Sequence, residues 1–279
     1  MRLFLIPLTP RRAFVYGHRL LGEGHKKKPS LLDRAITKSS EIWLKWENYE
    51  KGWQKKLTVY GNGLLRRISY EEWALKSIPA LARGVSASDH AKVPVVYPPS
   101  VMTPAEIPGL LHKLGTEKRG AHKRLLIWSI IGMPISAPFA LIPIIPNIPF
   151  FYLAFRAYSH WRALQGGHHL EFLVKNNLLD PQPDPQLDRI YKKKVEAVAE
   201  VADIDDAKIE KAAETGTMDE AAEEHLGEEF LLVEEPQAKE VSEVLKIPQL
   251  VVELQRACEQ VQAQLKEQQR KQTNHEKRS

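Results

Sequence analysis

The chain of 279 residues contains a single cysteine, Cys258. One cysteine excludes an intramolecular disulfide and any zinc or iron–sulfur site built from several cysteines. The sequence also lacks the GxSxG, P-loop, GxGxxG and HExxH patterns of common enzymes and nucleotide-binding proteins. We therefore predict no catalytic residue, no cofactor and no metal, and we expect that the protein is not an enzyme.

Charge is missing from one long segment and unevenly divided over the rest. Residues 1–124 carry 23 Lys and Arg against 10 Asp and Glu, a net charge of +13. Residues 125–155 carry no charged residue, and residues 156–279 carry 17 Lys and Arg against 25 Asp and Glu, a net charge of −8. A basic part, an uncharged part and an acidic part argue against a uniform soluble enzyme.

The uncharged segment has its borders at Leu125 and Phe155. About 20 apolar residues in a helix suffice to cross a bilayer, but five prolines interrupt this segment and disfavour one straight helix. We consider a kinked transmembrane helix, or a hairpin with one helix ending near Met133 and another starting near Asn147. Basic residues on both flanks favour the hairpin. The alternative is a buried, proline-rich helical pair inside a soluble fold.

The first 22 residues contain four arginines and no acidic residue. This composition is typical of a mitochondrial targeting segment, although Pro7 and Pro10 interrupt the helix that such a segment forms. The alternative is an extended segment that packs Leu3, Leu5 and Phe14 into a core.

Helical patterns dominate the remaining basic part. Aromatic and leucine side chains recur at helical spacing from Trp46 to Leu64, which predicts an amphipathic helix that lies on a membrane or packs into a core. Ser69 with Glu72, and Thr103 with Glu106, match the capping box of a helix start. No strand pattern is convincing, and no nucleic-acid motif accompanies the basic residues. We predict an all-α, helical membrane-associated protein without a nucleic-acid partner.

Arg156, His160 and Arg162 follow the uncharged segment. Arg156 and His160 lie four residues apart and would share a helix face. These basic side chains are candidates for an anionic lipid-headgroup or interface site, or they anchor a helix end at the interface. His168 and His169 are adjacent and lack a partner at metal-ligand spacing, so they do not predict a metal site.

The acidic part is expected to form a separate tail. Prolines between Asp180 and Pro185 predict a linker, and residues 186–279 predict an acidic, helical and partly disordered tail. Within residues 251–265, apolar side chains repeat at the spacing of a short coiled coil, which suggests self-association or a protein partner; the alternative is docking on the protein's own domain. The expected divisions are residues 1–124, 125–165, 166–185 and 186–279.

Two segments carry a resemblance to a known family. The opening MRLFLIPLTPRRAFVY and the segment PNIPFFYLAFRAYSHWRALQG, residues 146–166, resemble the mitochondrial K+/H+ exchange-related family, whose members are mostly fungal. The likeness covers roughly residues 1–180. It implies a mitochondrial inner-membrane protein connected with potassium–proton exchange, and it brings no catalytic residues to this chain.

The uncharged segment offers few groups for ion transport: Ser129, Ser136, Asn147 and Tyr152 are its main polar side chains. Ion pathways normally need ionisable or well-oriented polar groups at membrane depth. We therefore predict an accessory or regulatory component of potassium–proton exchange rather than an autonomous antiporter. The alternative function is a soluble or peripheral adaptor that acts through its amphipathic and coiled-coil helices.

Overall fold

The structure is a computed structural model that describes residues 1–18, 45–82, 86–136, 148–202 and 230–276, with single residues 41, 84 and 138. The chain forms two compact units, one of Met1–Arg19 with Tyr70–Ser279 and one of Leu20–Ser69. The predicted helix start at Asn147 and residues 203–229 of the predicted tail lie outside the described residues.

The smaller unit contains helix α2, Trp53–Arg66. This helix belongs to the predicted amphipathic stretch, and it continues through Gly61 and Gly63. The Asn62 side-chain amide donates to Glu47 over 2.7 Å. Tyr60 and Leu64 of the predicted aromatic face are exposed.

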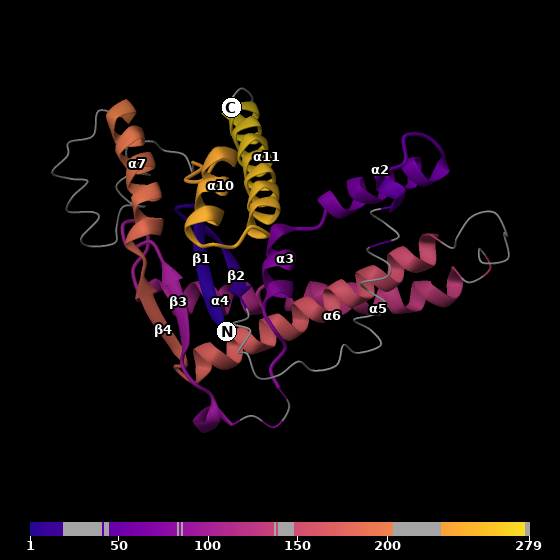
Figure 1. Cartoon of the computed structure of the whole chain (residues 1–279), viewed down its shortest axis with the longest axis horizontal. Helices are drawn as coiled ribbons and strands as arrows, with labels where there is room; N and C mark the ends of the chain where they lie inside the picture. The colour runs from indigo at the N-terminus through magenta and orange to yellow at the C-terminus, as the bar shows by residue number, and fades with distance from the viewer. Residues whose placement is uncertain are drawn as a thin grey trace. The chain divides into compact units, whose positions relative to one another are not determined.

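The larger unit is built on a four-stranded sheet with the order β2-β1-β3-β4 (Figure 1). Strand β1, Arg2–Thr9, pairs antiparallel with β2, Arg12–His18, and parallel with β3, Val93–Tyr97. Strand β4, Leu179–Pro183, continues the sheet parallel to β3. Leu3, Leu5 and Phe14 are fully buried, so residues 1–18 take the extended, core-packing conformation.

The prediction of an all-α fold is wrong, because the described part of the chain is a mixed α/β fold. Strand β1 is central and covered on both faces, so it reads as a continuous apolar run rather than an alternating one. Strand β4 contains Pro181 and Pro183, which were predicted to lie in a linker, and strand β3 contains Pro94. Pro181 and Pro183 are tolerated because β4 is an edge strand, and Pro94 of the central strand β3 precedes Val95 and Val96, the residues of β3 that pair with β1.

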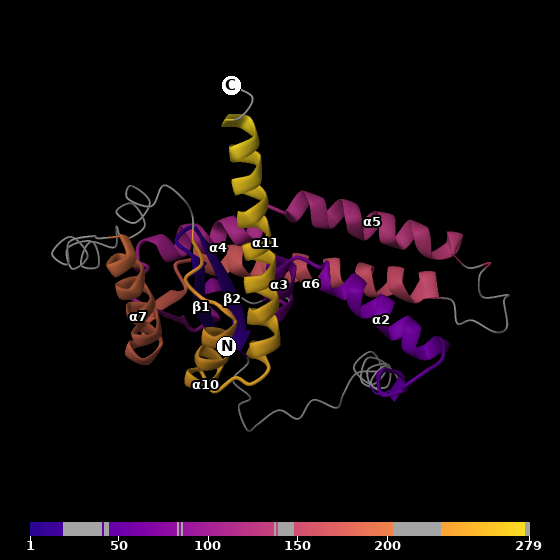
Figure 2. The ribbon, with the colours of Figure 1, turned by 90° about the horizontal axis from the view of Figure 1, so that it is seen from above.

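Helices α3, Tyr70–Ser77, α4, Glu106–Thr116, α5, Arg119–Ile135, and α6, Ile148–Lys175, pack together in the larger unit. A short 3-10 helix, Ala87–Asp89, precedes β3. Helix α6 contacts α3, α4 and α5. Its C-terminal half enters the core through Ala163, Leu170 and Leu173. Its N-terminal half lies beside α5 and away from the sheet in both views (Figures 1 and 2).

Two adjacent glycines let α6 approach its neighbours closely. A Cβ on Gly166 would overlap the backbone carbonyl oxygen of Leu75 in α3, and a Cβ on Gly167 would lie 2.7 Å from the carbonyl oxygen of Gly115 in α4. Real Cβ atoms do not come so near to backbone. The absence of side chains at these positions therefore fixes the backbone distances between α3, α4 and α6.

The C-terminal helices α7, Pro185–Ala202, α10, Glu235–Val244, and α11, Leu250–Glu276, belong to the same unit. The Tyr191 hydroxyl of α7 donates to the Pro7 carbonyl of β1 over 3.0 Å. The apolar seam of α11 is buried through Leu254, Cys258 and Val261, and α11 contacts α10, α3, β1 and β2. The described part of the seam thus packs against its own domain, while self-association through residues 251–265 stays a prediction.

Among the described residues, no helix combines the length and the apolar character that crossing a membrane requires. The predicted kinked transmembrane helix is therefore wrong for this part of the chain. Helix α5 has 17 residues and begins with the charged residues Arg119, Lys123 and Arg124, so its apolar stretch is too short to cross.

Candidate functional site

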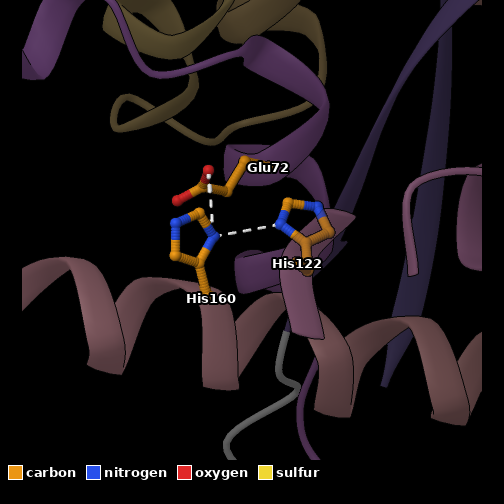
Figure 3. A group of neighbouring side chains, drawn as sticks. All are labelled: Glu72, His122 and His160. Atoms are coloured by element: carbon orange, nitrogen blue, oxygen red, sulfur yellow. Dashed lines mark hydrogen bonds and ion pairs between the residues drawn. The ribbon is translucent and has the colours of Figure 1, made fainter. Parts of the chain in front are cut away.

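Three helices bring Glu72, His122 and His160 together (Figure 3). Glu72 comes from α3, His122 from α5 and His160 from α6. All three side chains are buried, and their nearest nitrogen and oxygen atoms lie within 4.8 Å of one another. The Nδ1 atoms of the two histidines are 3.1 Å apart, and Nδ1 of His160 lies 3.7 Å from Oε2 of Glu72.

Two further residues of α6 complete this group, which we call the base cluster: Glu72, His122, Arg156, Ser159 and His160. The Ser159 hydroxyl donates to Glu72 Oε1 over 2.5 Å. The Arg156 guanidinium donates from Nη1 to Oε1 over 2.9 Å and from Nη2 to Oε2 over 3.3 Å. Positions 156, 159 and 160 share one face of α6 because they are three and four residues apart. Glu72 is therefore held by both oxygens, and Oε1 is held more tightly than Oε2.

The positions of the hydrogens follow from Arg156. Its Nη2 lies 3.0 Å from His160 Nε2, and a guanidinium can only donate, so Nε2 accepts and Nδ1 of His160 carries the hydrogen. That hydrogen points to His122 Nδ1, which accepts it. His122 Nε2 then carries a hydrogen, and this buried atom has no hydrogen-bond partner among the described residues. An orphaned buried donor costs about 1–3 kcal/mol, so the cluster is not optimised as a hydrogen-bond network.

The electrostatics keep both histidines neutral and the glutamate charged. Burial lowers the pKa of His160 to about 4, against the opposing effect of Glu72, and burial likewise lowers the pKa of His122. Burial raises the pKa of Glu72, but the Ser159 hydrogen bond and the charge of Arg156 outweigh it, so that the pKa of the carboxyl lies below its ordinary value.

A second cation borders the cluster. The Lys76 ammonium of α3 lies 3.6 Å from the centre of the Trp73 ring. Burial lowers the pKa of Lys76 to about 8, despite the charges of Glu72 and Glu253. Because Lys76 and Arg156 both lie near Glu72, the cluster contains more positive than negative charge when Lys76 is protonated.

The other end of the α5–α6 pair has the opposite character. We call residues 125–135 of α5 and 149–155 of α6 the tip. Ser129 of α5 and Ser136, which directly follows α5, are buried, whereas apolar side chains of the same helix are exposed. Trp128 is 64% exposed and Ser129 is 7% exposed. The exposed large apolar side chains of the tip are Leu125, Ile127, Trp128, Ile130, Ile131, Ile135, Phe150, Phe151 and Tyr152.

On the inner face of the tip, small groups of α5 face Leu153 of α6. The Ser129 and Ser136 hydroxyls donate to carbonyls of their own helix, those of Leu125 and Met133. Gly132 faces Leu153 so closely that an added Cβ would lie 3.0 Å from its side chain. Small residues inside and large apolar residues outside are the arrangement found between helices in lipid. In water, an exposed apolar face of this kind marks an interaction site.

The sequence-predicted site residues separate in the structure. Arg156 and His160 lie in the base cluster, whereas the Arg162 guanidinium donates to the Lys76 carbonyl over 3.2 Å. Their predicted contact with lipid headgroups stays a prediction. The segment border Leu125 is exposed on α5, and the ring of Phe155 lies 5.1 Å from the Lys76 ammonium.

Sequence reasoning missed Glu72, His122 and Ser159. Glu72 was interpreted as half of a capping box with Ser69, but its carboxylate is committed to Arg156 and Ser159. A signal for His122 did exist: His122, Ser129 and Ser136 are seven residues apart, which places them on one helix face. That polar face within an otherwise apolar helix could have identified the inverted packing of α5.

Comparisons with known proteins agree with the resemblance seen in the sequence. The chain is 31% identical over 194 residues to an uncharacterized protein of Schizosaccharomyces pombe, covering 69% of this chain and 83% of that protein. It is 26% identical over 204 residues to an uncharacterized protein of Saccharomyces cerevisiae, covering 63% of each. No solved structure matches. The family described as mitochondrial K+-H+ exchange-related matches residues 2–174. The chain belongs to this mitochondrial K+–H+ exchange-related family.

Proposed function

We propose that this protein is an accessory or regulatory component of mitochondrial potassium–proton exchange that works at the inner membrane. The family supports the connection with exchange and with mitochondria. The observation that carries the location is the inverted packing of the tip, in which small and polar groups face inward and apolar groups face outward. Burying one large apolar side chain contributes about 1.5–3 kcal/mol, so nine exposed ones favour transfer into lipid strongly.

The geometry supports shallow docking. Residues 125–135 form about 16 Å of helix at a rise of 1.5 Å per residue, which is about half of a 30 Å hydrocarbon core. The tip is therefore long enough to enter one leaflet. Lys123 and Arg124, which directly precede the tip, are exposed, and they would then lie at the level of anionic headgroups.

The accessory role rests on where the ionisable groups lie. The described tip contains no charged residue, so it offers no charged group at membrane depth to bind a potassium ion or a proton. In the base cluster, Glu72 is engaged by Arg156 and Ser159. An autonomous antiporter would need ionisable groups along its path through the membrane.

Liposome flotation of the purified full chain tests the location. The wild-type protein is expected to float with vesicles of phosphatidylcholine and cardiolipin. The double substitution Trp128→Glu with Ile131→Glu should lower binding at least about tenfold, because each loses the burial of a large apolar side chain. Val252→Glu is the matched control, since Val252 is 58% exposed on α11 and lies outside the tip. Equal flotation of all three proteins would contradict the proposal. Wild-type protein that remains in the bottom fraction while the vesicles float would also contradict it.

Ion flux tests the accessory role. Mitochondria that lack the protein should swell more slowly in potassium acetate, a medium in which swelling reports potassium–proton exchange. The wild-type gene should restore the rate, and the tip double variant should not. Vesicles that contain only the purified protein should show no potassium-dependent proton flux. Flux in those vesicles would show instead that the protein is itself a carrier.

A further inference from the structure

The base cluster has a donor set that neither the family nor the proposed function assigns to any ligand. The geometry points to a site for one divalent transition-metal ion of the Zn²⁺ class, held by Glu72 Oε2 and the Nδ1 atoms of His122 and His160. Such an ion would join α3, α5 and α6 at the base of the α5–α6 pair (Figure 3). This inference is independent of membrane docking.

The distances suit a metal of this kind. Zn–N and Zn–O bonds of about 2.0–2.2 Å in a tetrahedral site place ligand atoms about 3.3–3.5 Å apart. The two Nδ1 atoms are 3.1 Å apart, and His160 Nδ1 and Glu72 Oε2 are 3.7 Å apart. Shifts of a few tenths of an ångström therefore suffice for these two pairs. The third pair, Glu72 with His122, lies within 4.8 Å, so its two side chains have to approach each other by up to about 1.4 Å to reach the same spacing. Two imidazoles and one carboxylate form a donor set used by zinc.

The protonation states are those that a metal requires. Ligating histidines must be neutral and ligating carboxylates ionised. Burial holds the pKa values of His122 and His160 below their ordinary value, and Glu72 is ionised at neutral pH. Binding of a metal ion therefore releases no proton from either histidine. Only the tautomer of His160 has to change, with its hydrogen moving from Nδ1 to Nε2.

Hydrogen bonds from Ser159 and Arg156 orient the Glu72 carboxylate and leave its Oε2 atom available to a metal. Ser159 donates to Oε1 over 2.5 Å, and Arg156 Nη1 donates to the same atom over 2.9 Å. Oε2 accepts only the longer bond of 3.3 Å from Arg156 Nη2 among the described contacts. Hydrogen bonds that orient a ligand in this way accompany most metal sites.

Arg156 is the competitor of the metal. Without metal, its guanidinium supplies the positive charge beside Glu72 and donates to His160 Nε2. With metal on His160 Nδ1, Nε2 carries a hydrogen and cannot face Arg156 Nη2, so Nη2 must withdraw. Arg156 is partly exposed at 16%, which gives its head a route outward. Removal of the guanidinium should therefore strengthen metal binding, a result that neither misfolding nor surface binding would produce.

The test uses the purified full chain after chelator treatment, without lipid. Co²⁺ is titrated and followed by the visible absorption of a tetrahedral site, and Zn²⁺ affinity is measured against a chromophoric chelator. One ion should bind per chain. His122→Gln and His160→Gln should each weaken binding more than about 100-fold, beyond the 10–100-fold that loss of an outer partner costs. Arg156→Gln should strengthen binding about tenfold.

The matched control is His112→Gln, because His112 is an exposed histidine on α4. It should bind one ion with wild-type affinity, and circular dichroism should show that each variant is folded. Absence of a one-to-one site in the wild-type protein would overturn the inference. So would unchanged affinity in His122→Gln and His160→Gln, or an Arg156→Gln protein that binds no more tightly than wild type.

Discussion

The two ends of the α5–α6 pair reverse the usual arrangement of polar and apolar groups. At the base, charged and polar side chains are buried, and Glu72 is only 4% exposed. At the tip, the serines point inward and large apolar side chains point outward. Apolar atoms on a surface are common, but a contiguous apolar face is not. The base therefore determines how the pair is attached, while the tip determines what the pair contacts.

The largest effect is expected at the attachment of α6. Gly166→Ala places a Cβ against the Leu75 carbonyl, and backbone rather than a flexible side chain has to move. Overpacking usually costs about 1–3 kcal/mol; here we expect about 4 kcal/mol or more. Denaturant unfolding measures it. Gly120→Ala in α5 is the control, because nothing lies within 4 Å of its added Cβ, and alanine should stabilise that helix by up to about 1 kcal/mol. Equal stability of the two variants would contradict close packing at Gly166.

The next largest effect is expected at Glu72, and the adjacent Glu71 serves as its control. Glu72→Gln leaves Arg156 without its charged partner and should lower the free energy of unfolding by about 3 kcal/mol. Glu71→Gln removes a half-buried carboxylate that pairs with Lys118 and should cost less than about 1 kcal/mol. Thermal unfolding of the two variants checks the ranking. A reversed order would mean that the base cluster does not hold the α5–α6 pair.

Acid should lower the stability of the protein through the base cluster, because the tip contains no charged residue. The folded-state pKa of His160 is lowered to about 4 by burial, with Glu72, Arg156, His122 and Lys76 as its charged or titratable neighbours. The unfolded state therefore binds more protons below about pH 6.5, the ordinary value. Stability should be full above pH 6.5 and fall by up to about 3 kcal/mol as the pH drops to 4. The free energy of unfolding, measured by denaturant at several pH values in this window, should depend less on pH in His160→Gln than in the wild-type protein. An identical pH dependence in the two proteins would exclude His160 as the cause.

The smallest stability effect is expected at the tip. Trp128→Glu changes a side chain that is 64% exposed and should alter the free energy of unfolding by no more than about 0.5 kcal/mol. The same substitution contributes to the loss of vesicle binding predicted above. A large loss of stability would show that the ring of Trp128 packs within the protein, and the contrast between base and tip would not hold.

The sequence predicted the helical part of this fold better than the sheet. Of the capping box predicted at Thr103, only the hydrogen bond from the Thr103 amide to Glu106 forms, over 2.9 Å, because α4 begins at Glu106 with Ala105 as its N-cap. Helix α5 ends at Ile135, two residues beyond the predicted end of the first hairpin helix. Strand β1 escaped notice because both of its faces are buried. Strands β3 and β4 escaped notice because their prolines resemble a linker.

The base cluster could not be predicted, because its members come from three separate parts of the sequence, at positions 72, 122 and 156–160. Contacts across such separations depend on how α3, α5 and α6 pack, and that packing is set by features such as Gly166 and Gly167. Sequence spacing connected only Arg156 with His160. Their burial against Glu72 required the fold, which turned an expected interface pair into part of an internal cluster.

The most direct test of the central claim measures depth in the membrane at the two ends of the pair. In a Cys258→Ser background, a fluorophore is attached to Ile131→Cys at the tip or to Lys123→Cys near the base, and vesicles carry nitroxide on their acyl chains. Strong quenching is expected at position 131 and little at position 123. Equal quenching at both positions, or none at position 131 while the protein is bound to vesicles, would contradict it.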